Sequence, residues 1–242
     1  MADVLLIHGA GDSAAVWERQ VAALGTAHRL LALDLPGHGA RRAEPAHDDH
    51  AANAAEVERA LAAAGIDHAV VVGHSMGGAV ALTYALGQPA RLRALVLVAS
   101  GARLRMHPSL LETAREKAEA AAGATDLAGP VVPAERCLAP GAAPDLAAWL
   151  GAHAGQATAQ AVYADFRANN DFDVMDRLGE IRVPTLVVGG AQDAMTPPKF
   201  VQYLADSIPG AQLALLDGAG HYVMVEQAEA FNRRLAEFLD AL

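Results

Sequence analysis

Cysteine is nearly absent from this sequence of 242 residues, which contains Cys137 and no other. A single thiol cannot form a disulfide within the chain, so we expect a protein suited to a reducing compartment, with Cys137 as a buried thiol. Basic residues are also scarce, since 18 Lys and Arg stand against 28 Asp and Glu, for a net charge of −10. This balance disfavours nucleic acid and anionic membrane as partners, because both attract clustered positive charge.

Two further features are missing, a long apolar run and a leader. No apolar stretch approaches the length that crosses a bilayer, and no basic region precedes an apolar segment at the N-terminus. From these absences we predict a cytoplasmic protein. Hydrophobic residues make up 53% of the chain and charged residues 19%, which is typical of a globular protein with a large core, alone or with an insertion.

The most informative stretch joins a strand, a sharp turn and a helix. Residues 70–72 are three valines, typical of a buried strand, and residues 73–77 read Gly-His-Ser-Met-Gly, which fits G-x-S-x-G. A helical pattern follows and ends at Gly87. The glycines let the backbone pass close to the serine, and the helix N-terminus directs N–H groups at whatever the serine attacks. The pattern predicts Ser75 as a nucleophile; the alternative is an ordinary tight turn.

Short apolar runs alternate with amphipathic helical patterns along the chain. The runs cover residues 4–7, 30–34, 69–72, 94–99, 185–189 and 212–216. The first helix is marked by an apolar stripe at Trp17, Val21 and Leu24. Strands that alternate with helices in this way predict a parallel sheet with helices on both faces.

One long segment, residues 101–180, contains no strand pattern. It is rich in alanine, reads as helical and is broken at Pro133, Pro140 and Pro144. Because it follows the fourth strand, it leaves the sheet at the carboxyl edge, where Ser75 also lies. We therefore predict a core of residues 1–100 and 181–242 and a helical lid of residues 101–180 over the substrate. The alternative is a long helical crossover.

Four features together resemble the α/β-hydrolase superfamily. They are Ser75 in its turn, His8-Gly9 after the first strand, Asp193 after the fifth strand and His221 after the sixth. The order Ser, Asp, His is the order of that family. The resemblance covers the whole chain and implies an α/β fold with a six-stranded, mostly parallel sheet in the order 2-1-3-4-5-6. Family members usually have two strands before the His-Gly loop, so here we expect a sheet without that leading hairpin.

The resemblance also implies a catalytic triad and an oxyanion hole. His221 would accept the proton of Ser75, and Asp193 would set the tautomer of His221 and stabilise its imidazolium form. The alternative for His221 is a surface or capping residue, and for Asp193 it is an N-cap of the next helix. The backbone N–H groups of Ala10 and Met76 would hold the oxyanion of the tetrahedral intermediate.

Other side chains are candidates for weaker roles at the site. Candidate substrate contacts are His8, Gly9, Met106, His107, Trp149, Tyr163, Phe166 and Tyr222. Helical spacing alone would explain Tyr163 and Phe166 as core of the lid, and His8 is better suited to bracing its loop than to reacting. Arg103 and Arg105 could neutralise a substrate carboxylate or lie in water.

The segment His47-Asp48-Asp49-His50 resembles a metal cluster, but its spacing favours a polar loop in which an Asp caps a helix. We therefore expect no metal and no cofactor. Asp34 and Asp217 are interpreted as loop hydrogen-bonding groups.

These observations predict a serine hydrolase that cleaves a small carboxylic ester, lactone or thioester through an acyl-enzyme, as a monomer or homodimer. A serine nucleophile argues against a dehalogenase or epoxide hydrolase, which use Asp. Two alternatives stay open. One is a lyase or C–C bond hydrolase that uses the same triad as a base, and the other is a non-catalytic receptor for a small ligand.

Overall fold

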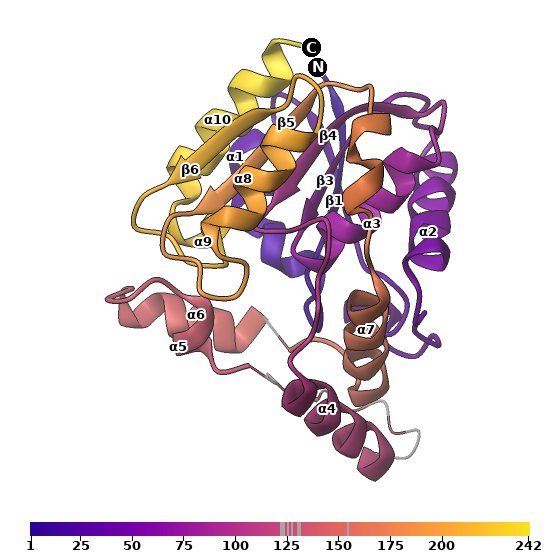
Figure 1. The fold of residues 1–242 in the computed structure, drawn as a ribbon, viewed down its shortest axis with the longest axis vertical. Helices are drawn as coiled ribbons and strands as arrows, with labels where there is room; N and C mark the ends of the chain where they lie inside the picture. Colours follow the sequence, from indigo (N-terminus) through magenta and orange to yellow (C-terminus); the bar gives the residue numbers. More distant parts are fainter. Residues whose placement is uncertain (122–123, 125, 127, 130–131, 154) are drawn as a thin grey trace.

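A computed structural model describes residues 1–121, 124, 126, 128–129, 132–153 and 155–242. Six strands form one sheet in the order β2-β1-β3-β4-β5-β6, and every pair of neighbours is parallel (Figure 1). The strands are β1 (Asp3–Ile7), β2 (Arg29–Leu33), β3 (Ala69–His74), β4 (Leu92–Val98), β5 (Thr185–Gly190) and β6 (Gln212–Leu216). The predicted α/β fold and strand order are confirmed, with a sheet that is wholly rather than mostly parallel.

Alternate side chains of the strands enter two separate cores. Leu5 and Ile7 of β1 lie in one core, and Val4 and Leu6 lie in the other. Because both faces of the sheet are covered, the strands read as unbroken apolar runs, as parallel strands with helices on both faces do.

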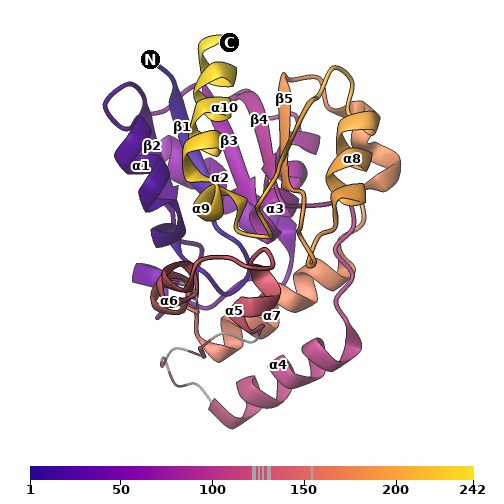
Figure 2. The ribbon, with the colours of Figure 1, turned by 90° about the vertical axis from the view of Figure 1, so that its left-hand side faces the viewer.

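Helices from different parts of the chain cover the two faces (Figures 1 and 2). One core takes side chains from α2 (His50–Ala63), α3 (Met76–Leu86) and α8 (Pro198–Ser207). The other takes them from α1 (Glu18–Leu24), α9 (Val223–Glu226) and α10 (Ala228–Asp240). The described residues also contain three short 3-10 helices: η1 (Ala14–Trp17), η2 (Gly39–Arg41) and η3 (Met175–Glu180).

The apolar stripe predicted for the first helix is wrong at Val21. Trp17 and Leu24 are buried, but Val21 is 40% exposed, and Gln20 is buried in its place. The buried positions are 17, 20 and 24, an i, i+3, i+7 spacing that is also one face of an α-helix, so the buried face differs from the predicted stripe by one position. The Gln20 amide nitrogen donates hydrogen bonds to the Met224 carbonyl at 2.8 Å and to Asn232 Oδ1 at 2.9 Å.

The chain between β4 and β5 forms a separate group of helices at one end of the molecule, opposite the two termini (Figure 1). We call residues 101–180 the helical segment; its described helices are α4 (Pro108–Ala121), α5 (Ala134–Cys137), α6 (Pro144–His153) and α7 (Ala159–Asp171). Helices α4 and α7 share a small core of their own that includes Ala114, Ala161 and Phe166. In the described ranges, no helix is long and apolar enough to cross a bilayer.

Candidate active site

The turn after β3 holds Ser75 in a strained conformation. Ser75 has φ 52° and ψ −114°, a region that residues with a side chain rarely adopt. The flanking glycines are required by close backbone contacts. A Cβ on Gly73 would lie 2.1 Å from the Gly77 carbonyl oxygen, and a Cβ on Gly77 would lie 2.5 Å from that of Ile7. The sequence therefore builds a tight strand-to-helix turn with Ser75 at its apex.

His221 and Asp193 meet in a buried hydrogen bond. His221 Nδ1 lies 2.9 Å from Asp193 Oδ2, and the two residues are 7% and 4% exposed. Because the carboxylate is an acceptor, Nδ1 carries the proton and Nε2 keeps a free lone pair. Ser75 and His221 line the same cavity. The arrangement thus places an imidazole oriented by Asp193 and a serine hydroxyl in the wall of one cavity.

Asp193 is held ionised by several donors. Burial by itself raises the pKa of Asp193, but the charge and hydrogen bond of His221, together with bonds from Thr196, outweigh it, and the pKa lies below its usual value. The Thr196 hydroxyl lies 2.7 Å from Asp193 Oδ2, and the backbone N–H groups of Met195 and Thr196 donate to Oδ1 at 2.8 and 2.9 Å. The N-cap of α8 is Pro197, so Asp193 orders this loop without capping the helix.

The loop after β1 lies against the Ser75 turn. A Cβ on Gly77 would lie 2.6 Å from the His8 carbonyl oxygen, so the end of β1 lies close to the start of α3. Gly9 and Ala10 line the cavity together with Ser75. Within the described part of the chain, no acceptor is paired with the N–H of Ala10 or of Met76. Ala10 lines the cavity, whereas Met76 is not among its lining residues.

His8 braces this loop in its neutral form. The Leu35 N–H donates to Nε2 at 3.2 Å, so Nδ1 carries the proton and donates to the Gly9 carbonyl at 2.8 Å. Burial, followed by the nearby charge of His38, lowers the pKa of His8 to about 3. His8 is completely buried, so it supports the cavity wall from behind.

The cavity has a volume of about 330 Å³ and lies between the sheet edge and the helical segment. Of the candidate substrate contacts, the structure places Gly9, Met106, Phe166 and Tyr222 along it. Candidates that do not line it in the described structure are His8, His107, Trp149 and Tyr163.

Three of those candidates have other contacts. The Trp149 indole donates to Glu18 at 3.0 Å and stacks on His153, which directs it toward α1. Exposed His107 lies 2.8 Å from the Ser109 hydroxyl, and Tyr163 packs against the small core of the helical segment. Trp149 and Tyr163 lie on helices, where periodicity alone does not decide which face meets the cavity, and His107 precedes the first residue of α4.

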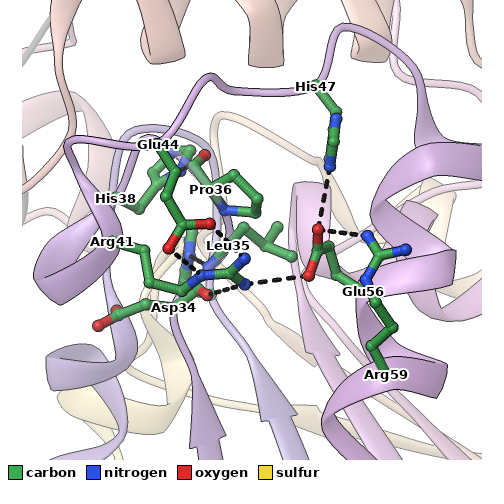
Figure 3. Close-up of polar contacts among 10 residues, drawn as sticks. Asp34, Leu35, Pro36, His38, Arg41, Glu44, His47, Glu56 and Arg59 are labelled. Atoms are coloured by element: carbon green, nitrogen blue, oxygen red, sulfur yellow. Dashed lines mark hydrogen bonds and ion pairs between the residues drawn. The ribbon is translucent and has the colours of Figure 1, made fainter.

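Side chains of the His47–His50 segment form hydrogen bonds and ion pairs with residues elsewhere in the chain. Figure 3 shows Glu56 between His47, Arg41 and Arg59, with His47 Nε2 3.1 Å from Glu56 Oε1. Asp49 is the N-cap of α2, as the spacing predicted. Asp34 accepts hydrogen bonds from Ala14 and Ala40 N–H groups, as a loop residue would. Over the described ranges, no three His, Cys, Asp or Glu side chains converge as metal ligands.

Sequence reasoning missed two polar groups in the cavity wall. Asp12 is 2% exposed and accepts hydrogen bonds from the Tyr222 hydroxyl at 3.0 and 3.2 Å. His74 donates from Nε2 to the His221 carbonyl at 3.0 Å, and burial, followed by the charge of His221, lowers its pKa to about 3. The sequence feature that could have identified both residues is their position, because Asp12 follows His8-Gly9 in the same loop and His74 directly precedes Ser75.

Comparison with known proteins agrees with this geometry. Residues 4–234 match the model of a family described as "Alpha/beta hydrolase family". A Variovorax paradoxus protein named "Putative carbamate hydrolase RutD" is 37% identical over 258 positions, covering 98% of this chain and 91% of that protein. A pimeloyl-acyl-carrier-protein methyl ester esterase of Neisseria meningitidis is 32% identical over 247 positions, covering 99% and 77%.

Solved structures are similar over the whole chain. A thermophilic esterase from Thermogutta terrifontis superposes with a TM-score of 0.87 at 27% identity, covering 100% of this chain and 90% of that one.

Proposed function

Since this chain belongs to the alpha/beta hydrolase family, we propose that it cleaves a small carboxylic ester, lactone or thioester with Ser75 as the nucleophile. One observation carries the proposal. The buried His221–Asp193 hydrogen bond lies in the wall of the cavity that Ser75 also lines, which leaves His221 Nε2 free to take a proton. Relatives named as esterases support an ester as the substrate class.

The first half of the proposed reaction acylates Ser75. His221 Nε2 takes the hydroxyl proton as the serine oxygen attacks the carbonyl carbon, and Asp193 stabilises the imidazolium that forms. The N–H groups of Ala10 and Met76 bind the resulting oxyanion. Collapse of the intermediate breaks the bond to the leaving group, which departs with the proton from His221.

The second half releases the acid. His221, neutral again, removes a proton from a water molecule that attacks the acyl-enzyme carbonyl. The same two N–H groups bind the second oxyanion. When the intermediate collapses, Ser75 recovers its proton from His221 and the carboxylic acid leaves.

A second candidate substrate class is a carbamate, because several relatives carry the name "Putative carbamate hydrolase RutD". A carbamate carbonyl demands the same nucleophile, base and oxyanion hole. A matched pair of p-nitrophenyl acetate and p-nitrophenyl N-methylcarbamate separates the two, since the leaving group is common to both. If each protein molecule releases one p-nitrophenolate from the carbamate and then stops, the carbamoyl-enzyme is not hydrolysed. The protein is then an ester hydrolase that carbamates inactivate.

The test of the mechanism is turnover of p-nitrophenyl acetate and butyrate by the wild-type protein and by Ser75→Ala. We expect the variant to lose turnover on the order of 10⁴-fold or more. An unchanged rate would overturn the proposal. A fluorophosphonate that labels Ser75, while no ester is turned over, would favour a lyase that uses the triad as a base. Ligand-driven thermal stabilisation without labelling or turnover would indicate a receptor.

A further inference from the structure

A carboxylate from the helical segment reaches the loop that carries Ala10. Asp165 Oδ2, on α7, accepts a hydrogen bond from the backbone N–H of Gly11 at 2.9 Å. The same oxygen lies 2.9 Å from Nε2 of His38, and the two side chains are 2% and 1% exposed. Gly11 has φ 75°, and its missing Cβ would lie 3.4 Å from Val162, also on α7. Helix α7 thus packs directly on residues 9–12, which we call the oxyanion loop.

Both ring nitrogens of His38 face acceptors. Nε2 faces Asp165, and Nδ1 lies 2.9 Å from the Pro36 carbonyl oxygen. A neutral imidazole has one N–H, so it would leave one lone pair against an acceptor, whereas an imidazolium satisfies both contacts. Burial lowers the pKa of His38, but the charge and hydrogen bond of Asp165 and the bond to Pro36 outweigh it, and the pKa is raised. Asp165 and His38 therefore form a buried ion pair.

Hydrogen bonds fix both peptide planes of Ala10. The Gly9 carbonyl accepts from His8 Nδ1 at 2.8 Å and from the Asp12 N–H at 3.2 Å. In a planar trans peptide this carbonyl points opposite to the N–H of Ala10, so these bonds turn that N–H away from the loop's own acceptors. The following peptide is held by the bond from Gly11 to Asp165. The orientation of the Ala10 N–H depends on all three contacts.

We propose that Asp165, held by His38, is a positioning residue that orients the N–H of Ala10 toward the oxyanion. The inference rests on the proposed function, since it concerns the oxyanion hole. A buried ion pair brings little net stability, because the cost of desolvation offsets the attraction. What this pair supplies is an acceptor at a defined place, 154 residues from Gly11 along the chain. The helical segment thereby takes part in transition-state binding as well as in enclosing the substrate.

The test compares three variants of α7 on p-nitrophenyl butyrate, with active-site concentration titrated by a fluorophosphonate. Asp165→Ala removes the acceptor, and Asp165→Asn keeps an oxygen that can accept from Gly11. Arg167→Gln is the matched control, because Arg167 lies on the same helix and joins it to the core through an exposed ion pair with Asp48 at 2.9 Å.

We expect Asp165→Ala to lower kcat about 10–100-fold, less than outright loss of an oxyanion donor, with KM little changed. Asp165→Asn recovers part of kcat, and Arg167→Gln keeps wild-type values. Affinity for phenylboronic acid, which forms a tetrahedral adduct with serine, falls in Asp165→Ala by about the same factor as kcat/KM, because the adduct uses the same N–H groups. A merely structural defect would lower the titrated concentration and leave kcat per site unchanged.

A second variant covers the case in which Asp165→Ala does not fold. His38→Gln removes the imidazolium charge and one of the two ring N–H donors, so Asp165 is held less firmly beside Gly11, and kcat is expected to fall by less than in Asp165→Ala. If Ser75→Ala abolishes turnover but Asp165→Ala keeps wild-type kcat, the positioning role is wrong and the proposed function stands. If Asp165→Ala does not fold, wild-type kcat in His38→Gln leads to the same conclusion. Full activity in Ser75→Ala overturns the proposed function, and the positioning role with it.

Discussion

Asp12 is a buried carboxyl that forms no ion pair within the described residues. Its hydrogen-bond donors are the Tyr222 hydroxyl, at 3.0 and 3.2 Å, and no ion pair to it is formed in the described ranges. Burial raises the pKa of Asp12 from 3.8 to about 7, although the Tyr222 hydrogen bond and the charge of His221 act to lower it. Near neutral pH the protein thus carries a carboxyl group poised between its charged and neutral forms in the wall of the cavity.

This shift predicts a pH-dependent gain in stability for Asp12→Asn. The folded protein holds the Asp12 proton between about pH 4 and pH 7, where the unfolded chain has lost it, so wild-type stability falls as pH rises through that window. Asparagine cannot ionise. The Tm of the variant relative to wild type should therefore be higher at pH 8 than at pH 5, measured by thermal unfolding. Asp217→Asn, on an exposed loop, is the control, and an equal difference at both pH values would contradict the prediction.

Two elements of the helical segment hold the two loops that carry the proposed chemistry. Helix α7 bonds to the oxyanion loop through Asp165. On the other side, the His221 N–H donates to the Cys137 carbonyl of α5 at 2.7 Å, and the Glu226 carboxylate accepts from both Ala139 and Gly220 N–H groups. The segment between β4 and β5 is thus bonded to the frame of the site at both sides.

The strand-to-helix turn predicts a sharp difference between two Gly→Ala substitutions. In Gly77→Ala the new Cβ would lie 2.5 and 2.6 Å from the carbonyl oxygens of Ile7 and His8, which must move apart from α3. We expect a loss of about 1–3 kcal/mol in the free energy of unfolding, by urea denaturation. The control is Gly179→Ala in η3, where no atom lies within 4 Å of the new Cβ. That change should stay within about 0.5 kcal/mol. Equal effects of the two substitutions would refute the steric argument.

At the scale of the whole molecule, the cavity that Ser75 and His221 line lies between the sheet edge and the helical segment. Its volume of about 330 Å³ is near the lower end of the range for small-molecule sites. Its wall carries apolar side chains such as Met106, Val162 and Phe166 beside the polar groups of the site. Under the proposed function, we expect this space to hold a short acyl chain.

We therefore predict that kcat/KM for p-nitrophenyl esters is highest between acetate and butyrate and falls for octanoate and laurate. The physical reason is that a long chain must displace packed side chains of the helical segment, at a cost that its apolar contacts do not recover. A series of esters with one leaving group measures the effect. A value that rises steadily to laurate would show that the cavity opens to longer chains.

The sequence by itself determined the elements and their order. Unbroken valine and leucine runs, Gly73 and Gly77 around Ser75, and loops that follow strands are local patterns, and right-handed parallel connections bring all strand ends to one edge. The resemblance to the α/β-hydrolase superfamily added the expectation that Asp193 and His221, 28 residues apart, meet, as they do in the structure. The strand order 2-1-3-4-5-6 was likewise implied by that resemblance and is confirmed.

Only the tertiary structure decided which faces of the helices meet the site. Local periodicity left Trp149 and Tyr163 as candidates for the cavity, but helix rotation turns them to other partners. The local sequence pattern also gave no sign that Asp165 accepts a hydrogen bond from Gly11, because a contact across 154 residues depends on how α7 packs against the core. A pattern of neighbours specifies what a segment becomes, whereas the partners of its side chains are set by packing between segments that are distant in the chain.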